Sequence, residues 1–117
     1  MSTPEGKIKN EVKKILAEFM ERDHRTMEAK LKQFWPVQNG MGSPSLDCLV
    51  CYRGLMIAIE TKAPGKKPTP RQETTIAEYR ASGAIVLVID GEKGYEELRQ
   101  ALNLIKWSHA DNRQQQA

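Results

Sequence analysis

The sequence predicts an α/β (α+β) domain in which helices flank one central sheet. Three observations lead to this prediction. Apolar residues recur at helical spacing near the N-terminus, two β-rich runs separated by Arg53-Gly54 follow in the middle, and a capped helix precedes another strand further on. At 117 residues the chain has room for one compact domain, and it contains no internal repeat.

The first element is a helix that begins with a capping hydroxyl at Thr3, a first-turn proline at Pro4 and an acid at Glu5 near the positive end of the helix dipole. The charged stretch from Glu21 to Lys32 holds the helix end, a loop or a second short helix. The apolar stripe of the first helix consists of Ile8, Val12, Ile15, Leu16 and Phe19.

Strands dominate the middle of the chain. Phe34 to Val37 is a short strand that Pro36 restricts to an edge of the sheet, and the Gly/Ser/Pro-rich stretch from Asn39 to Ser45 is a loop. Cys48 to Arg53 and Leu55 to Lys62 are two strands, and the Arg-Gly pair between them predicts a hairpin.

A second helix follows a loop rich in proline, glycine and lysine. Thr69, Pro70 and Gln72 match a capping box, with the threonine as cap, the proline at the first helical position and the glutamine at the third. This helix runs to about Ser82, and Gly83 ends it.

The last two elements are a buried strand from Ala84 to Asp90 and a final helix. We expect one domain over residues 1–107 and a polar, glutamine-rich, disordered tail over residues 108–117. The apolar positions of the final helix are Tyr95, Leu98, Leu102 and Ile105.

The composition is that of a globular protein, with 39% hydrophobic residues, 28% charged residues and a formal net charge of +3. This mildly basic balance is compatible with nucleic acid as a partner but does not establish it. The longest apolar run, Ala84 to Ile89, is far shorter than the ~20 residues of a membrane-spanning helix. Cys48 and Cys51 face opposite sides of a strand, so we expect them to be small core residues rather than a metal-binding or disulfide pair. With only two cysteines, the sequence indicates a reducing cytoplasm.

Two acids and a lysine stand at the ends of the predicted hairpin. Side chains alternate along a strand, so Glu60 and Lys62 share one face while Thr61 points to the other. If the turn takes two residues, the register places Asp47 directly opposite Glu60, with Cβ atoms ~5 Å apart. Two carboxylates at that separation repel each other and favour a cation between them.

Oxygen ligands of this kind suit Mg²⁺ or Mn²⁺, which polarise a phosphate and activate water. Lys62 would then orient the water or stabilise charge on the phosphate. The alternative is an exposed strand end in which Lys62 forms a salt bridge to either acid. Apolar residues on both faces of the hairpin and the basic loop after it favour the metal site, although a slip of one residue would turn Asp47 away from Glu60.

Three stretches carry a resemblance to a known family: residues 42–47 (GSPSLD), 59–65 (IETKAPG) and 69–72 (TPRQ). In these the sequence resembles the virus-type replication-repair nuclease (VRR-NUC) family, a branch of the PD-(D/E)xK nucleases, and is most similar to its short phage and prophage members. The resemblance runs from about Pro4 to Asp90. One departure is that Ser45 and Leu46 separate the proline from Asp47, where the usual form is Pro-Asp.

The resemblance implies a restriction-endonuclease-like αβββαβ core with a mixed sheet. It also implies a Mg²⁺-dependent endonuclease that hydrolyses DNA, often branched DNA such as four-way junctions, and that forms a homodimer. Asp47 and Glu60 would be metal ligands, the backbone carbonyl of Thr61 a further ligand and Lys62 the catalytic lysine.

Two further residues match the family but also have a structural explanation. Glu5 matches the acidic residue of the first helix, and it is equally a first-turn acid that stabilises the helix dipole. Gln72 matches the glutamine that opens the helix after the Glu-x-Lys strand, and the capping box alone would also explain it.

A basic loop follows the candidate site. Lys66, Lys67 and Arg71 give, with Lys62, four cations and no acid across ten residues, which beside such a site predicts phosphate contacts rather than a solvated loop. Gly42 and Ser43 would let backbone approach DNA, although flexibility alone also explains them. The candidate dimer surface comprises Phe34, Trp35, Val37, Met20 and Met27.

Two other functions compete with the nuclease. One is a nuclease fold that retains DNA or protein binding after catalysis is lost, and the other is an assembly subunit whose acidic pair is only structural. Degenerate relatives usually lose an acid or the lysine, whereas Asp47, Glu60 and Lys62 are all present.

Overall fold

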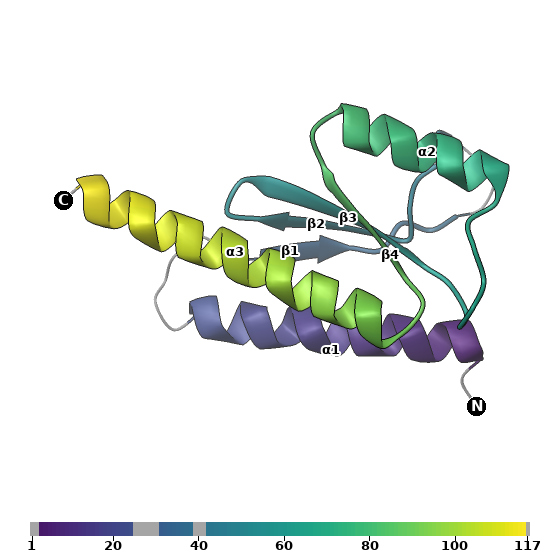
Figure 1. Ribbon diagram of the computed structural model, residues 1–117, viewed down its shortest axis with the longest axis horizontal. Coiled ribbons are helices and arrows are strands. Elements are labelled where there is room, and N and C mark those ends of the chain that lie inside the picture. The colour runs from purple at the N-terminus through teal and green to yellow at the C-terminus, as the bar shows by residue number, and fades with distance from the viewer. Residues whose placement is uncertain (1–2, 25–30, 39–41, 117) are drawn as a thin grey trace.

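The computed structural model describes residues 3–24, 31–38 and 42–116, and in this part of the chain helices cover both faces of a four-stranded sheet (Figure 1). The order of elements confirms the predicted αβββαβ core, and the predicted final helix follows it. The elements are α1 (Pro4–His24), β1 (Leu31–Phe34), β2 (Cys48–Tyr52), β3 (Leu55–Thr61), α2 (Pro70–Ala81), β4 (Ile85–Ile89) and α3 (Glu92–Gln116).

The sheet is mixed, with strand order β1-β2-β3-β4. The pairs β1–β2 and β2–β3 are antiparallel, whereas β3 and β4 are parallel because α2 carries the chain back to the starting end of the sheet. In the hairpin Tyr52 pairs with Leu55 and Cys48 with Ile59, which confirms the predicted register.

The turn between β2 and β3 fixes that register. Arg53 and Gly54 both have positive φ, at 52° and 85°, as the two central residues of a type I′ turn do. A turn of this type matches the right-handed twist of the strands it joins, so the hairpin closes with two residues as expected.

Each face of the sheet packs on its own apolar cluster. On the side of α2 the cluster contains Leu46, Ala58, Ile76 and Val86. On the side of α1 and α3 it contains the predicted stripes of both helices together with alternate residues of the strands, including Val50, Ile57 and Ile59. The hairpin is therefore covered on both faces, and each buried aliphatic side chain contributes about 1.5–3 kcal/mol to that packing.

The helix ends confirm two of the predicted caps. The Thr3 hydroxyl accepts a hydrogen bond from the Gly6 N–H at 2.9 Å, and α2 begins with a complete capping box between Thr69 and Gln72. Gly83, at φ 99°, follows the end of α2. None of the helices in residues 3–24 and 42–116 is long and apolar enough to cross a membrane.

Two element boundaries differ from the sequence predictions. The edge strand spans Leu31–Phe34 rather than residues 34–37, because the buried Leu31 pairs with Tyr52 and Pro36 has no N–H to continue the ladder. The disordered tail expected over residues 108–117 is also wrong for most of its length, since α3 continues as one helix to Gln116. The sequence predicts a helix end, a loop or a second short helix between Glu21 and Lys32. Residues 25–30 of this stretch lie outside the described part of the chain.

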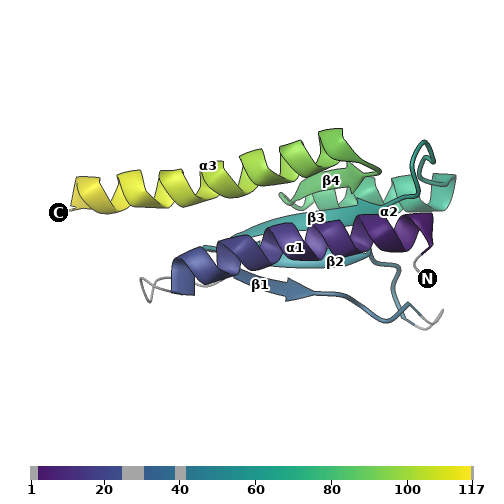
Figure 2. The same cartoon turned by 90° about the horizontal axis from the view of Figure 1, so that it is seen from below.

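All three helices begin at the same end of the sheet, the end at which β3 and β4 finish (Figures 1 and 2). Helix N-termini carry partial positive charge and orphan N–H groups, so this end of the molecule favours anions. The candidate site residues of the hairpin lie at this end.

Candidate functional site

Glu60, Thr61 and Lys62 lie at the carboxyl end of β3. Glu60 is 2% exposed and Thr61 is fully buried, whereas Lys62 is half-buried. The parallel ladder pairs Glu60 with Val88 and ends where the Lys62 N–H donates to the Ile89 carbonyl at 2.9 Å. The backbone of all three residues is therefore held by the neighbouring strand.

Asp47 stands just before β2 and reaches the end of β3 with its side chain. Its Oδ2 accepts hydrogen bonds from the Thr61 backbone N–H at 2.9 Å and from the Thr61 hydroxyl at 2.8 Å. Its Oδ1 accepts a third, from the Gln38 amide at 3.2 Å. Leu46 and Cys48 lie in the clusters on opposite faces of the sheet, so the strict alternation of β2 breaks at Asp47.

The carboxyl groups of Asp47 and Glu60 are in contact. Burial raises the pKa of Glu60 from 4.5 to about 8, and the hydrogen bond to Asp47 and its negative charge act in the same direction, while the charge of Lys62 lowers the pKa. At neutral pH Glu60 therefore carries a proton. The two acids meet at this end of the hairpin, and protonation of Glu60 removes the repulsion that two ionised carboxylates would exert on each other.

Lys62 influences Glu60 at a distance. Within the described parts of the chain its ammonium forms no ion pair with either acid, and the ion pairs found there join residues of α1 and α3. The simple salt bridge considered as the alternative is therefore not formed. A half-buried ammonium beside a buried carboxyl is free to contact a ligand.

The structure does not bring Glu5 to the acidic pair. Its carboxylate lies 3.8 Å from Lys9 Nζ on the same helix, and the described residues contain no group of three metal-ligating His, Cys, Asp or Glu side chains. Asp47 and Glu60 thus form a pair without Glu5 as a third member. Glu5 nevertheless lies in the first turn of α1, which begins at the same end of the sheet (Figure 1).

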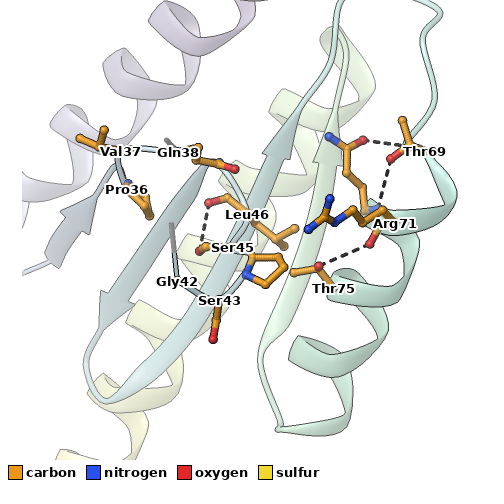
Figure 3. Close-up of a pocket in the computed structure, with 12 residues that line it drawn as sticks. Pro36, Val37, Gln38, Gly42, Ser43, Ser45, Leu46, Thr69, Arg71 and Thr75 are labelled. Carbon is orange, nitrogen blue, oxygen red and sulfur yellow. Dashed lines mark hydrogen bonds between the residues drawn. The ribbon is translucent and has the colours of Figure 1, made fainter. Parts of the chain in front are cut away.

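Gln72 performs its structural role. Its side-chain oxygen accepts from the Thr69 N–H at 3.0 Å, and its own N–H donates to the Thr69 hydroxyl at 3.2 Å. The same side chain also lines a groove between residues 36–38, residues 42–46 and the start of α2 (Figure 3).

This groove has a volume of about 390 Å³ and adjoins Asp47 through Gln38, which belongs to its wall. Figure 3 shows Gly42 and Ser43 on one side and Arg71 on the other, so the groove joins three of the predicted DNA contacts. The exposed Lys66 and Lys67 lie outside it, in the loop between β3 and α2.

Known proteins resemble this chain in fold more than in sequence. The sequence matches no protein-family profile and no curated protein. Among solved structures it is similar to one titled "VRR_NUC domain", with a TM-score of 0.67 and 24% sequence identity, over 85% of this chain and 97% of that chain. The chain has the VRR_NUC fold. The fold that the sequence resemblance implied is thus confirmed over nearly the whole length of that domain.

Within the VRR_NUC fold of this chain, the donor set fits a hard divalent cation. Two carboxyl groups in contact supply only oxygen, and one of them holds a proton that a cation would replace. Mg²⁺ is commonly held by one or two carboxylates, with water and substrate phosphates completing its coordination. The pair in this chain would supply the carboxylates of such a site.

Three side chains around the site were not anticipated from the sequence. The Thr61 hydroxyl and the Gln38 amide hold Asp47, and the Asp90 carboxylate accepts from the Gly65 N–H at 3.2 Å and so holds the basic loop against the end of β4. The alternation rule assigned the Thr61 side chain to the opposite face. The Thr61 hydroxyl reaches Asp47 only because the alternation of β2 breaks at Asp47.

Proposed function

We propose that this chain is a divalent-metal-dependent endodeoxyribonuclease that uses Mg²⁺ or Mn²⁺ to hydrolyse phosphodiester bonds. The observation that carries the proposal is the contact between the carboxyl groups of Asp47 and Glu60, with Lys62 two residues further along the same strand. It is supported by the VRR_NUC fold and by the three helix N-termini at this end of the sheet.

Each residue has a role in this proposal. Asp47 and Glu60 hold the cation, with the backbone carbonyl of Thr61 as a further ligand, and Glu5 is not among the ligands of this arrangement. The cation supplies Lewis-acid polarisation of the phosphate. Lys62 places a positive charge beside the phosphate and stabilises the charge that develops there, and Gln72 orients the substrate from the groove.

Lys62→Ala is expected to lower the cleavage rate by about 100- to 1000-fold, because one positioned charge-stabilising group contributes about that much. Affinity for Mn²⁺ should change little, since the ammonium is not a ligand. Single-turnover cleavage and Mn²⁺ titration measure the two effects separately. Loss of metal affinity in this variant would contradict the assigned role, and Lys32→Ala on β1 serves as the matched control.

The exposed Lys66 and Lys67 are proposed to bind DNA phosphates together with Arg71, while Gly42 and Ser43 bring backbone close to the strand. Replacing both lysines by alanine should weaken DNA affinity equally for all sequences and reduce the salt dependence by about one unit for each phosphate that the protein no longer neutralises. Fluorescence anisotropy at several salt concentrations measures this slope. An unchanged slope would remove the loop from the DNA interface.

We further propose that the chain acts as a homodimer on branched DNA such as four-way junctions. A junction is two-fold symmetric and needs two matched cuts, which a C₂ dimer places in the required relation. Support comes from the large exposed apolar side chains on and beside the edge strand, Phe34 at 59% and Val37 at 85%, with Met20 at 38% on α1. Trp35 is partly buried beneath Lys13, and Met27 lies outside the described residues.

The two cysteines support a reducing compartment. Cys48 is buried, Cys51 is exposed, and neither forms a disulfide. From the sequence resemblance to short phage and prophage nucleases, we further propose a phage or prophage origin and the cytoplasm of a bacterial host cell as the location of the enzyme.

The proposed function is tested by incubating the protein with supercoiled plasmid and with a synthetic four-way junction, each with Mg²⁺ or with EDTA. Cleavage of both only in Mg²⁺, with faster cleavage of the junction, is expected. Light scattering should give about twice the 13.3 kDa chain mass. A pure DNA-binding module would shift the junction in a gel without cutting it, and a monomer that still cut junctions symmetrically would exclude the dimer.

A further inference from the structure

We propose that the side-chain hydroxyl of Thr61 is a positioning group that fixes Asp47 and directs one of its two oxygens, Oδ1, toward an incoming divalent cation. This inference rests on the proposed function, because it assigns a role within the same site. It adds a residue whose backbone alone was considered from the sequence.

Hydrogen bonds, rather than the strand ladder, orient the carboxylate of Asp47. The residue lies outside β2, where the ladder no longer constrains the backbone, and the chain changes direction between Leu46 and Cys48. Among the described residues, Thr61 supplies two bonds to this carboxylate, at 2.9 Å from the N–H and 2.8 Å from the hydroxyl, Gln38 supplies one, and the Glu60 carboxyl is also in contact with it. Thr61 is therefore the principal restraint on the side chain.

Burial makes the bond from the Thr61 hydroxyl hard to replace. Any residue except proline would supply the N–H at position 61, but the second bond needs a donor on the side chain, which here is the hydroxyl. Thr61 is 0% exposed, so water does not replace Asp47 as its partner. A buried hydroxyl without a partner is costly, and the bond between Thr61 and Asp47 is therefore strongly favoured.

The two oxygens of Asp47 are not equivalent. Oδ2 accepts both bonds from the buried Thr61, whereas Oδ1 accepts one longer bond, 3.2 Å, from the exposed Gln38 amide. The amide is the partner that leaves more readily. Thr61 thus occupies Oδ2 and leaves Oδ1 as the oxygen that exchanges its partner for a cation.

The test compares Thr61→Val, which keeps the shape and removes the hydroxyl, with Thr61→Ser, which keeps the hydroxyl. Mn²⁺ affinity is measured without DNA, by electron paramagnetic resonance of free Mn²⁺. The valine variant should bind about 10- to 100-fold more weakly, as is typical when a group that orients a metal ligand is removed, and the serine variant should bind like the wild type. Cleavage by the valine variant should need correspondingly more Mn²⁺.

Gln38→Ala is the third variant. Gln38 is exposed, so its replacement by alanine should leave the protein folded. The affinity for Mn²⁺ should be unchanged or tighter in this variant. Urea unfolding establishes that each variant is folded, and Thr61→Ala replaces the valine variant if the latter is not.

Equal affinity of the valine variant and the wild type would overturn the proposal, as would equal losses in the serine and valine variants. A loss in Gln38→Ala as large as that in Thr61→Val would overturn the distinction between the two oxygens. If the wild type itself neither binds Mn²⁺ nor cleaves DNA, the proposed function fails, and this outcome is visible before any variant is made.

Discussion

Glu60→Gln is expected to reduce Mg²⁺-dependent cleavage by about 1000-fold or more while leaving the fold intact. The substitution removes one of the two carboxylates proposed to hold the cation, which supplies several kcal/mol of transition-state stabilisation. The fold should tolerate it because Glu60 is buried and already protonated at neutral pH, so a neutral amide of the same shape fits its place.

The matched control is Glu73→Gln, which makes the same change in an exposed acid of the first turn of α2. Its cleavage rate should stay close to that of the wild type. Asp47→Asn should lose as much activity as Glu60→Gln, but with some loss of stability as well, because Asp47 accepts hydrogen bonds from Thr61 and Gln38. Full activity in Glu60→Gln would remove the acidic pair from the catalytic site.

The second large effect concerns the stability of the metal-free protein, which should fall as the pH rises from 4.5 to about 8. In the folded state the pKa of Glu60 is raised to about 8, whereas in the unfolded chain it is near the ordinary value of 4.5. Below pH 4.5 both states hold the proton and the folded state keeps its full stability. Between the two values only the folded state holds the proton, so stability declines with pH.

The size of this effect is bounded by about 1.4 kcal/mol for each unit of pKa difference, or about 5 kcal/mol in total. Urea unfolding in EDTA at several pH values from 4.5 to 9 measures it. Glu60→Gln should lack this component and should be more stable than the wild type at pH 8.5. Equal pH dependence in both proteins would show that Glu60 is not the group responsible.

Saturating Mn²⁺ should reverse the decline at high pH, because a cation between the two carboxylates replaces the proton and stabilises their ionised forms. The same titration in Glu60→Gln should give little stabilisation. The comparison separates a metal site from a merely strained pair of acids.

The register of the hairpin was predictable because it depends on local chemistry. Arg53-Gly54 takes the two positive φ angles of a type I′ turn, and a two-residue turn leaves only one pairing of the strands that follow. The capping box of α2 was equally local, since Thr69 and Gln72 are three residues apart. From the hairpin register the proximity of Asp47 and Glu60 could be anticipated.

The residues that hold Asp47 could not be predicted, because they depend on departures from regular structure. Alternation placed the Thr61 side chain on the face opposite Glu60, and therefore away from Asp47. That expectation assumed that Asp47 continues the regular alternation of β2, which it does not. The chain bends at Asp47 to bury Leu46 under α2, and that tertiary demand turns the carboxylate toward Thr61. Gln38 reaches Asp47 from nine residues away, across a loop whose path no local rule specifies.

The two misplaced boundaries have different origins. Aromatic and β-branched content favoured a strand at residues 34–37, but the partner strand required the buried Leu31 opposite Tyr52. The polar segment after residue 107 lacks an apolar stripe, yet it continues a helix already held by Leu98, Leu102 and Ile105 against the sheet. Propagation of an existing helix costs much less than its nucleation.

The most direct test of the central claim is calorimetric titration of Mn²⁺ into the metal-free protein at pH 7 in two buffers of different ionisation enthalpy. If Asp47 and Glu60 hold the cation, binding should displace the proton of Glu60, so that the wild type releases close to one proton per bound Mn²⁺. Glu60→Gln should bind far more weakly and release none. Binding of equal strength in the variant, or binding without proton release in the wild type, would contradict the assignment of this pair as the metal site.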